Sequence, residues 1–408
     1  MTMKPFSKTP EGIPVLPLRK GKEESLDRFH PWVFSGALVR MPEESDGIEE
    51  GDLVAVAASD GRLIGVGHFQ IGSIAVRILS FDASEKVDRQ FYHSRLEQAR
   101  CLRKALDLPN AQTDAFRLVH GEGDFLPGLV VDVYGDTAVM QAHSPGMHFD
   151  RMAIAECLTG LSELGIKNVY YKSETTLPYK AHLDQQNGYL VGKYSHDEAL
   201  ENGIRFHVDW LKGQKTGFFV DQRDNRELLR RYSRGRSVLN MFCYTGGFSL
   251  YALAGGARKV VSVDSSAKAI ALTNANVELN EPACSRHEAF AEDAFKFLDK
   301  IEYGEYDLIL LDPPAFAKHR SALRNALQGY RRLNAKAFEK IAPGGIIFTF
   351  SCSQAVNKDQ FRLAVFSAAA QSGRKVRILH QLTQPADHPI NIYHPEGEYL
   401  KGLVLYVE

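Results

Sequence analysis

Between residues 237 and 350, short apolar segments alternate with segments that have the apolar spacing of helices. We expect strands at 237–241, 259–263, 308–311 and 346–350, and helices at 248–254 and 267–279. Apolar strands that alternate with helices are typical of a parallel sheet covered by helices on both faces. This pattern restricts the second half of the chain to an open α/β fold.

The first half of the chain has a different pattern. Short strands separated by turns are expected at 15–18, 52–56, 63–67 and 74–79, which favours a small β-barrel. Helices at 88–106 and near 150–164, with strands at 128–135, 137–141 and 168–171, predict a middle α+β domain. A chain of 408 residues is long enough for several cores. We therefore expect three domains, at 1–82, 83–192 and 193–408.

Charge and cysteine content narrow the functional classes. The 49 Lys and Arg residues against 50 Asp and Glu residues give a net charge of -1, so RNA contacts would need local patches. The five cysteines form no CxxC pair, which predicts neither a metal site nor a disulfide framework and indicates a reduced, cytoplasmic compartment. No stretch reaches the roughly eighteen apolar residues of a membrane-spanning helix, so we expect no membrane association.

A glycine turn follows the first strand of the α/β region. Gly246 and Gly247 let the backbone approach a ligand closely before a helix begins, and their spacing fits neither GxGxxG nor a Walker loop. Asp264 ends the next strand, 18 residues after Gly246, where an acid can bind ribose hydroxyls. Asp293 ends a third segment and could receive an adenine amine. With the turn Asp312-Pro313-Pro314, this order resembles the S-adenosylmethionine site of a Rossmann-like methyltransferase.

Each of these signals has a plainer interpretation when it is taken alone. The glycine pair could form an ordinary turn between a strand and a helix, and Asp264 could be a helix N-cap. Their order and spacing along the chain favour the cofactor site.

A cysteine follows the last of the apolar strands. Cys352 and Asp312 come after neighbouring strands of the series, and the carboxyl ends of such strands face one ligand crevice. A thiol beside an acid-Pro-Pro turn suggests covalent chemistry on a pyrimidine ring. Cys352 could instead be a small buried core residue, Asp312 a simple turn acid, and Cys243 in the glycine turn a rival thiol.

Several long motifs resemble those of one family, the bacterial large-subunit ribosomal RNA methyltransferases that form 5-methylcytosine. The motifs are RFHPWVFSGA at 28–37, GEGDFLPGL at 121–129, QKTGFFVDQR at 214–223, FCYTGGF at 242–248, ADHP at 386–389 and PEGEYLK at 395–401. The resemblance runs essentially end to end. It implies an N-terminal PUA β-barrel, a middle α+β domain and a Rossmann-like class I methyltransferase domain that uses S-adenosylmethionine on ribosomal RNA.

The resemblance also implies a mechanism. Carbon 5 of cytosine is a poor nucleophile, and a thiolate that adds to carbon 6 activates it. Cys352 is the expected thiolate, and Asp312 is expected to bond to N3 and the exocyclic amine. The expected cofactor contacts are Lys215, Thr216, Asp221, Arg223, Phe242, Tyr244, Thr245, Gly246, Asp264, Ser265, Asp293, Ala294 and Asp312. No metal is expected, and no residue is identified as the base that removes the carbon-5 proton.

Three basic clusters are candidates for phosphate contacts. They are Arg19, Lys20 and Lys22; Arg226, Arg230 and Arg231; and Lys318, His319, Arg320 and Arg324. A solvated helix face explains the second cluster at least as well. His388 could orient the base or be structural.

Other functions stay open at this point. An enzyme that methylates an exocyclic nitrogen needs no thiol, whereas a 5-methyluridine enzyme also uses one. An RNA-binding assembly factor without catalysis is a third alternative. The sequence does not decide between a monomer and a homodimer.

Overall fold

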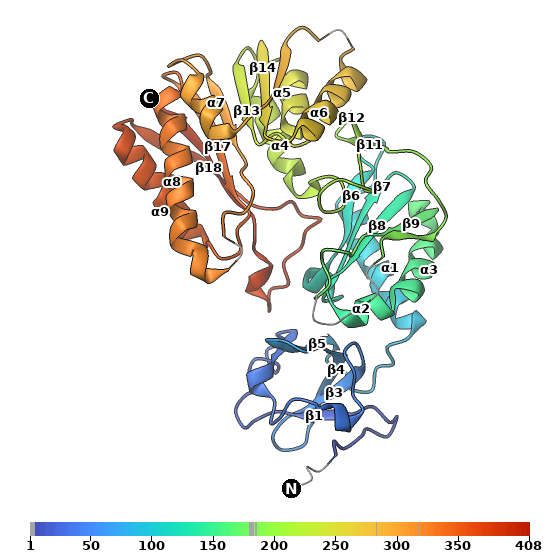
Figure 1. Cartoon of the computed structure of the whole chain (residues 1–408). Coiled ribbons are helices and arrows are strands. Elements are labelled where there is room, and N and C mark those ends of the chain that lie inside the picture. Colours follow the sequence, from blue (N-terminus) through green and yellow to red (C-terminus); the bar gives the residue numbers. More distant parts are fainter. Residues whose placement is uncertain (1–4, 179–182, 184–185, 283, 318) are drawn as a thin grey trace. The chain divides into compact units, whose positions relative to one another are not determined.

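The computed structural model describes residues 5–178, 183, 186–282, 284–317 and 319–408 (Figure 1). The chain forms two compact units. Unit 1 consists of Met1–Asp197, Val208–Val220 and Ala386–Gly397, and unit 2 consists of Glu198–His207, Asp221–Pro385 and Glu398–Glu408. Segments distant in sequence therefore belong to the same unit.

The N-terminal part of unit 1 is a five-stranded sheet with the order β1-β3-β4-β5-β2. The strands are β1 (Val15–Pro17), β2 (Trp32–Phe34), β3 (Leu53–Ala57), β4 (Leu63–Phe69) and β5 (Ile74–Ser80). The four expected strands are confirmed, and β2 was not expected. Leu16, Val54 and Val76 are fully buried in the core of this sheet.

The middle part of unit 1 has a second five-stranded sheet, with the order β10-β9-β8-β7-β6. Its elements are α1 (Arg89–Ala105), β6 (Ala115–His120), β7 (Leu129–Tyr134), β8 (Thr137–Ala142), α2 (Pro145–Phe149), α3 (Arg151–Gly160), β9 (Asn168–Tyr171) and β10 (Gly188–Val191). Helix α1 begins after Asp88, whose side chain accepts from the backbone N–H groups of Gln90 and Phe91. The expected α+β pattern is confirmed, with β6 and β10 in addition.

The segment 386–397 completes unit 1. Asp387 is fully buried, and its carboxylate accepts from the backbone N–H of Arg117 over 3.0 Å. Arg103 donates from Nη2 to the Asp387 carbonyl oxygen over 2.7 Å. His388 is also buried, with Nδ1 3.2 Å from Asp387 Oδ1. These hydrogen bonds attach the ADHP motif to the middle part of unit 1.

Unit 2 contains a seven-stranded sheet with the order β15-β14-β13-β16-β17-β19-β18. The strands are β13 (Ser237–Met241), β14 (Lys259–Asp264), β15 (His287–Ala291), β16 (Leu308–Leu311), β17 (Gly345–Ser351), β18 (Val376–Leu382) and β19 (Lys401–Val407). The first five in this order are parallel, whereas β19 is antiparallel to both β17 and β18. The four strands expected from the alternating pattern are confirmed as parallel neighbours, and β18 and β19 extend the sheet beyond that pattern. Strand β19 follows β18 without an intervening α-helix, as antiparallel neighbours allow.

Helices cover both faces of this sheet (Figure 1). Leu239, Met241 and Ile309 belong to the apolar core that is shared with α7 (Ala294–Lys300), α8 (Leu323–Lys340) and α9 (Lys358–Ser372). The opposite face meets α4 (Arg223–Tyr232), α5 (Gly247–Ala254) and α6 (Ala267–Asn280). A hairpin of β11 (Glu198–Glu201) and β12 (Ile204–His207) adjoins α6.

The strand order reverses between β13 and β16. In open α/β sheets, ligands bind outside the carboxyl ends of the strands at such a switch point. Among the described helices, none is long and apolar enough to cross a membrane.

Candidate active site

Four sequence-predicted positions follow the carboxyl ends of neighbouring strands in unit 2. The glycine turn follows β13, Asp264 ends β14, Asp312 follows β16, and Cys352 follows β17. Because these four strands are parallel neighbours, the structure brings the four positions to one edge of the sheet.

The glycine turn has an unusual backbone. Phe242, Tyr244 and Gly246 have φ angles of 60°, 48° and 80°. A Cβ atom at Gly246 would lie 2.7 Å from Cγ2 of Thr273, so glycine is required there. Helix α6 holds the turn, because Thr273 Oγ1 donates to the Tyr244 carbonyl oxygen over 2.9 Å. Left-handed non-glycine residues that packing holds in place are common at ligand sites.

Asp264 is bonded to the turn and to the start of α6. Its Oδ2 accepts from the backbone N–H of Tyr244 over 3.0 Å, and its Oδ1 accepts from the backbone N–H of Ser266 over 2.9 Å. The side chain that caps α6 belongs to Ser266, so Asp264 is not the N-cap of this helix. Each carboxylate oxygen can accept a further hydrogen bond. The Asp264 carboxylate can therefore bind a ligand that donates from hydroxyl groups.

The other predicted contacts on this side are close in sequence to β14 and β15. Ser265 is exposed next to Asp264. Asp293 is the exposed N-cap of α7, where its Oδ1 accepts from the backbone N–H of Lys296 over 3.0 Å, and Ala294 is buried in the first turn. Asp293 thus has a structural role that leaves its second carboxylate oxygen at the surface.

Asp312 is oriented by a residue that the sequence interpretation missed. Gln222 donates from Nε2 to Asp312 Oδ2 over 3.0 Å, and its Oε1 accepts from Asn225 Nδ2 over 2.6 Å. The second bond fixes which end of the Gln222 amide faces the carboxylate. Its position between Asp221 and Arg223, inside the motif at 214–223, was the available signal.

Cys352 is half-buried beside the Asp-Pro-Pro turn, with Sγ 4.0 Å from the Pro313 carbonyl oxygen. The two neighbouring serines are fully buried. Ser351 Oγ lies 2.9 Å from the hydroxyl oxygen of Tyr330 in α8, and Ser353 Oγ lies 3.2 Å from the same oxygen. One tyrosine thus holds the backbone on both sides of the cysteine.

Cys243 differs from Cys352 in its surroundings. It is buried in the glycine turn, and burial raises the pKa of its thiol to about 12. A thiolate is the nucleophilic form of cysteine, so Cys243 is a poor candidate for addition to a base.

The four residues predicted from the motif at 214–223 are divided between the two units. In unit 1, Thr216 Oγ1 donates to Asp132 Oδ2 over 2.6 Å, and Lys215 Nζ lies 4.5 Å from the ring centre of Phe219. In unit 2, the carboxylate of Asp221 accepts from the Tyr399 hydroxyl over 2.8 Å, and Arg223 is the buried first residue of α4. Their role as cofactor contacts stays a prediction.

The structure corrects one of the basic clusters. Arg226 is buried and forms two bonds of 2.7 Å to the carboxylate of Glu201, so the expected phosphate contact and the alternative of a solvated face are both wrong for this residue. Arg230 and Arg231 pair with Glu227 on the surface of α4. Lys318 lies outside the described residues, as does the side chain of Arg320.

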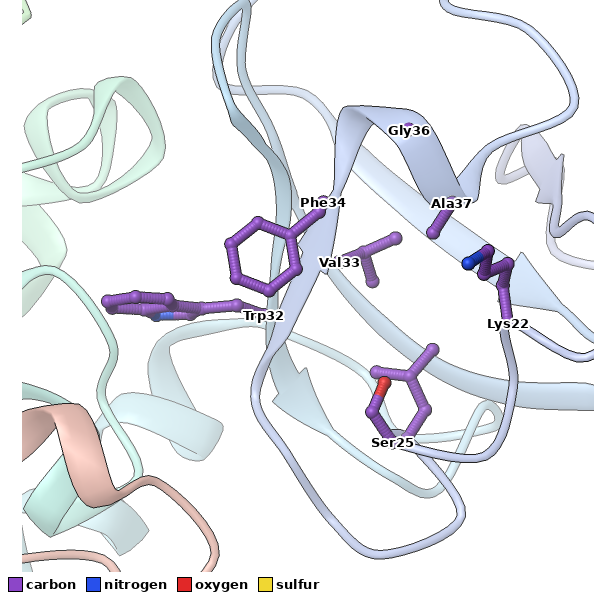
Figure 2. Close-up of a pocket in the computed structure, with 8 residues that line it drawn as sticks. Lys22, Ser25, Trp32, Val33, Phe34, Gly36 and Ala37 are labelled. Carbon is purple, nitrogen blue, oxygen red and sulfur yellow. The ribbon is translucent and has the colours of Figure 1, made fainter.

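The N-terminal cluster adjoins a cavity of about 320 Å³ in unit 1 (Figure 2). Its lining includes Lys22, Trp32 and Phe34. Lys20 is exposed, whereas Arg19 donates from Nε to the Leu38 carbonyl oxygen over 2.8 Å. The Trp32 indole points away from Lys22 (Figure 2) and donates from Nε1 to Glu122 over 2.8 Å, so Phe34 is the lining residue with an exposed ring.

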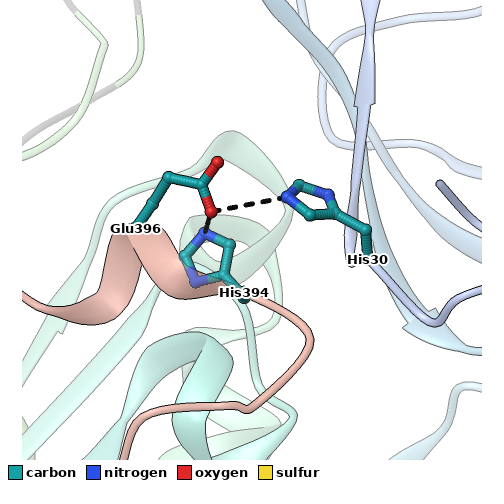
Figure 3. A group of neighbouring side chains, drawn as sticks. All are labelled: His30, His394 and Glu396. Atoms are coloured by element: carbon teal, nitrogen blue, oxygen red, sulfur yellow. Dashed lines mark ion pairs between the residues drawn. The ribbon is translucent and has the colours of Figure 1, made fainter.

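A second cluster in unit 1 joins His30, His394 and Glu396 (Figure 3). Glu396 Oε2 lies 3.5 Å from Nε2 of His30 and 3.6 Å from Nε2 of His394. Such a group could hold a metal ion if both rings offered a lone pair. The backbone N–H of Trp32, however, donates to Nδ1 of His30 over 3.2 Å. A neutral His30 therefore has its proton on Nε2, which disfavours metal binding there, and the expectation of no metal stays a prediction.

Comparisons with known proteins match most of the chain. A family model described as S-adenosylmethionine-dependent methyltransferase matches residues 174–396, and one described as a PUA-like domain matches residues 16–81. A protein of Tolumonas auensis named ribosomal RNA large subunit methyltransferase I is 40% identical, over 95% of this chain and 98% of its own length. A Klebsiella pneumoniae protein of the same name is 39% identical over 97% of this chain and 98% of its own length.

Solved structures share the fold. A putative S-adenosylmethionine-dependent methyltransferase from Streptococcus mutans superposes with a TM-score of 0.81 at 22% identity, over 96% of this chain and 100% of its own. A putative methyltransferase complexed with SAH gives a TM-score of 0.82 at 22% identity, with the same coverage.

Proposed function

Because the chain belongs to the ribosomal RNA large subunit methyltransferase I family, whose enzymes depend on S-adenosylmethionine, we propose that it methylates carbon 5 of a cytosine in large-subunit ribosomal RNA. The reaction would take place in the cytoplasm and would use a covalent adduct of Cys352. The observation that supports this chemistry most directly is the distance of 4.0 Å between Cys352 Sγ and the Pro313 carbonyl oxygen, which places a thiol beside the Asp-Pro-Pro turn.

The cofactor would be bound by residues at the ends of β13, β14 and β15. The backbone of the glycine turn approaches it, the Asp264 carboxylate accepts from its ribose hydroxyls, and Asp293 receives the adenine amine. The two existing bonds from the backbone N–H groups of Tyr244 and Ser266 keep the Asp264 carboxylate in one orientation. When bound, S-adenosylmethionine supplies the electrophilic methyl group.

Cys352 would activate the base. Its thiolate would add to carbon 6 of the cytosine, and the ring electrons would move to carbon 5. Carbon 5 would take the methyl group as the bond between that group and the cofactor sulfur breaks, and S-adenosylhomocysteine would leave. Loss of the carbon-5 proton and departure of the thiolate restore the aromatic ring. The contacts of Tyr330 to the serines on both sides limit the movement of Cys352, as a nucleophile that must meet one ring atom requires.

Asp312 would orient the ring. Its carboxylate accepts from the exocyclic amine of cytosine, and when protonated it donates to N3, where negative charge develops during thiolate addition. Gln222 restricts the carboxylate through the bond of 3.0 Å to Oδ2. Because an amine at position 4 distinguishes cytosine from uracil, this contact favours cytosine as the target.

The PUA-like region would supply RNA affinity. The near-zero net charge of the chain requires local basic patches, and the lining of the cavity combines the Lys22 amine with the exposed ring of Phe34. Aromatic side chains stack on bases of single-stranded RNA, and amines contact its phosphates.

Two measurements test the proposal. The wild-type protein should form a covalent adduct with RNA that contains 5-fluorocytidine, because fluorine cannot leave carbon 5 as a proton. Nucleoside mass spectrometry of large-subunit ribosomal RNA from a deletion strain should lack one 5-methylcytidine, which returns when the protein is restored. A missing 5-methyluridine, or a missing nucleoside methylated on an exocyclic nitrogen, would contradict the cytosine assignment.

A further inference from the structure

A buried cation lies close to the backbone of Cys352. Lys401 begins β19, is only 4% exposed, and pairs in register with Ser351, the residue before the cysteine. Its Nζ donates to the Ser353 carbonyl oxygen over 2.6 Å and to the Tyr399 carbonyl oxygen over 2.7 Å. The amine is therefore held against the peptide between Ser353 and Gln354, one residue beyond Cys352.

The contacts of Lys401 continue to a second predicted site residue. The hydroxyl of Tyr399 donates to Asp221 over 2.8 Å, so this carboxylate fixes the residue whose carbonyl oxygen receives the lysine. Because its amine donates to two carbonyl oxygens, the Lys401 side chain has little freedom to turn away from β17. A long, flexible side chain is rarely buried in this way without a partner of opposite charge.

Few charged groups act on this amine. Burial lowers the pKa of Lys401 to about 8, Cys352 and then Glu398 oppose this change, and Lys358 of α9 adds to it. Glu398 and Lys358 pair with each other at the surface, with Nζ and Oε1 2.9 Å apart and side chains 53% and 44% exposed. Of the charged groups, Cys352 has the largest effect on the pKa of Lys401, and the residues on either side of it are the ones to which Lys401 is paired and bonded.

We propose that Lys401 is a positioning residue that favours the thiolate of Cys352 over the thiol, through the positive charge that its two carbonyl contacts hold beside β17. The inference rests on Cys352 as the nucleophile of the proposed function. Ionisation releases the proton of the thiol to solvent, and the ammonium group stabilises the negative sulfur that remains. An opposite charge favours the ionised form of a nearby group.

The charge can be separated from the hydrogen bonds by two substitutions. Lys401→Gln keeps two N–H donors for the carbonyl oxygens but has no charge, whereas Lys401→Arg keeps the charge. Lys358→Gln removes a positive charge from the exposed pair with Glu398 and is the matched control. Circular dichroism confirms that each variant is folded, and Lys401→Met replaces the Gln variant if that protein does not fold.

The measurement is the rate of alkylation of Cys352 by iodoacetamide as a function of pH, followed by peptide mass spectrometry. Exposed Cys101 of the same molecule is the internal reference thiol. We expect Lys401→Gln to raise the pH midpoint for Cys352 by about one unit, which slows its alkylation at pH 7 about tenfold, while Cys101 is unchanged. Lys401→Arg and Lys358→Gln should keep the wild-type midpoint.

An unchanged midpoint in Lys401→Gln, or equal shifts in the Gln and Arg variants, would overturn the inference. Alkylation requires neither RNA nor methyl transfer, so its result is separate from the proposed function. Activity that survives in Cys352→Ala would contradict the covalent mechanism, whatever the alkylation midpoints are.

Discussion

Ser262 in β14 and His287 in β15 are joined side by side across the sheet, with Oγ and Nε2 2.8 Å apart. The contact continues inward, because Ser249 Oγ lies 2.7 Å from Ser262 Oγ, and Asn240 donates to Ser249 over 2.8 Å. A polar chain thus crosses β13, β14 and β15 beneath the proposed cofactor turn. Burial lowers the pKa of His287 from 6.5 to about 4, so the imidazole ring is neutral at neutral pH.

His287 makes stability depend on pH. The unfolded chain binds a proton at this ring below about pH 6.5, whereas the folded chain stays neutral down to about pH 4. Unfolding takes up a proton in this window, so the free energy of unfolding falls as the pH falls from 6.5 to 4. We expect His287→Gln to reduce this fall by about 2–3 kcal/mol in urea denaturation. Identical pH profiles for the variant and the wild type would contradict this role.

Cys352→Ala should abolish methyl transfer while S-adenosylmethionine affinity stays within about threefold, because the thiol acts on the base. The same variant should form no adduct with 5-fluorocytidine RNA. Calorimetry measures the cofactor, and methyl incorporation into ribosomal RNA measures activity. Ser367→Ala is the control, at a half-buried position of α9 where the hydroxyl donates to the Leu363 carbonyl oxygen over 2.8 Å. Normal turnover by the cysteine variant would exclude the covalent mechanism.

Asp264→Ala should weaken S-adenosylmethionine binding by about 1–3 kcal/mol, as the loss of charge-assisted hydrogen bonds implies. Part of this loss would come from the turn, because the carboxylate also holds the backbone of Tyr244. Asp264→Asn keeps one acceptor oxygen and should lose less. Calorimetry compares the two variants, and an affinity equal to that of the wild type in Asp264→Ala would show that the cofactor binds elsewhere.

The two candidate thiols should differ in reactivity. With a pKa of about 12, Cys243 is ionised to only about one part in ten thousand at pH 8, so iodoacetamide should leave it unmodified while it labels Cys101. Peptide mass spectrometry reads both sites in one sample. Rapid labelling of Cys243 in folded protein would restore it as a rival nucleophile.

The double variant Lys20→Gln and Lys22→Gln should bind large-subunit ribosomal RNA more weakly and with a smaller salt dependence. Each phosphate contact that is lost lowers the log–log slope by about 0.7 to 0.9. Lys167→Gln is the control, since that side chain is 76% exposed on the middle part of unit 1. An unchanged slope in the double variant would remove this patch from the RNA interface.

The sequence was most informative where one interaction dominates. Buried parallel strands are continuously apolar, so β13, β16 and β17 could be predicted within a residue or two of their bounds. The expected cluster of Asp264, Asp312 and Cys352 at one sheet edge followed from strand order alone. By contrast, β18 is largely exposed and has no apolar run that marks it.

Residues whose role depends on a distant partner were harder to predict. Gln222 and Lys401 are single polar residues whose contacts lie 90 and 48 positions away. Arg226 has the helical spacing of a surface residue, yet its partner Glu201 is in the hairpin before the sheet. Local patterns carry no information about such pairs.

Unit 1 is assembled from segments that are far apart in the sequence, and this affects how it folds during synthesis on the ribosome. Arg103 and Arg117 are buried early in the sequence, and both bond to Asp387. The N-terminal unit therefore cannot reach its final packing until residues 386–397 have left the exit tunnel, after nearly all of unit 2 has been translated. Translation order and folding order differ in this protein, and a nascent chain arrested before residue 386 would lack the Asp387 oxygens that accept from the Arg103 side chain and the Arg117 backbone N–H. The pairs of Arg103 with Asp124 and of Arg117 with Asp132 could already form.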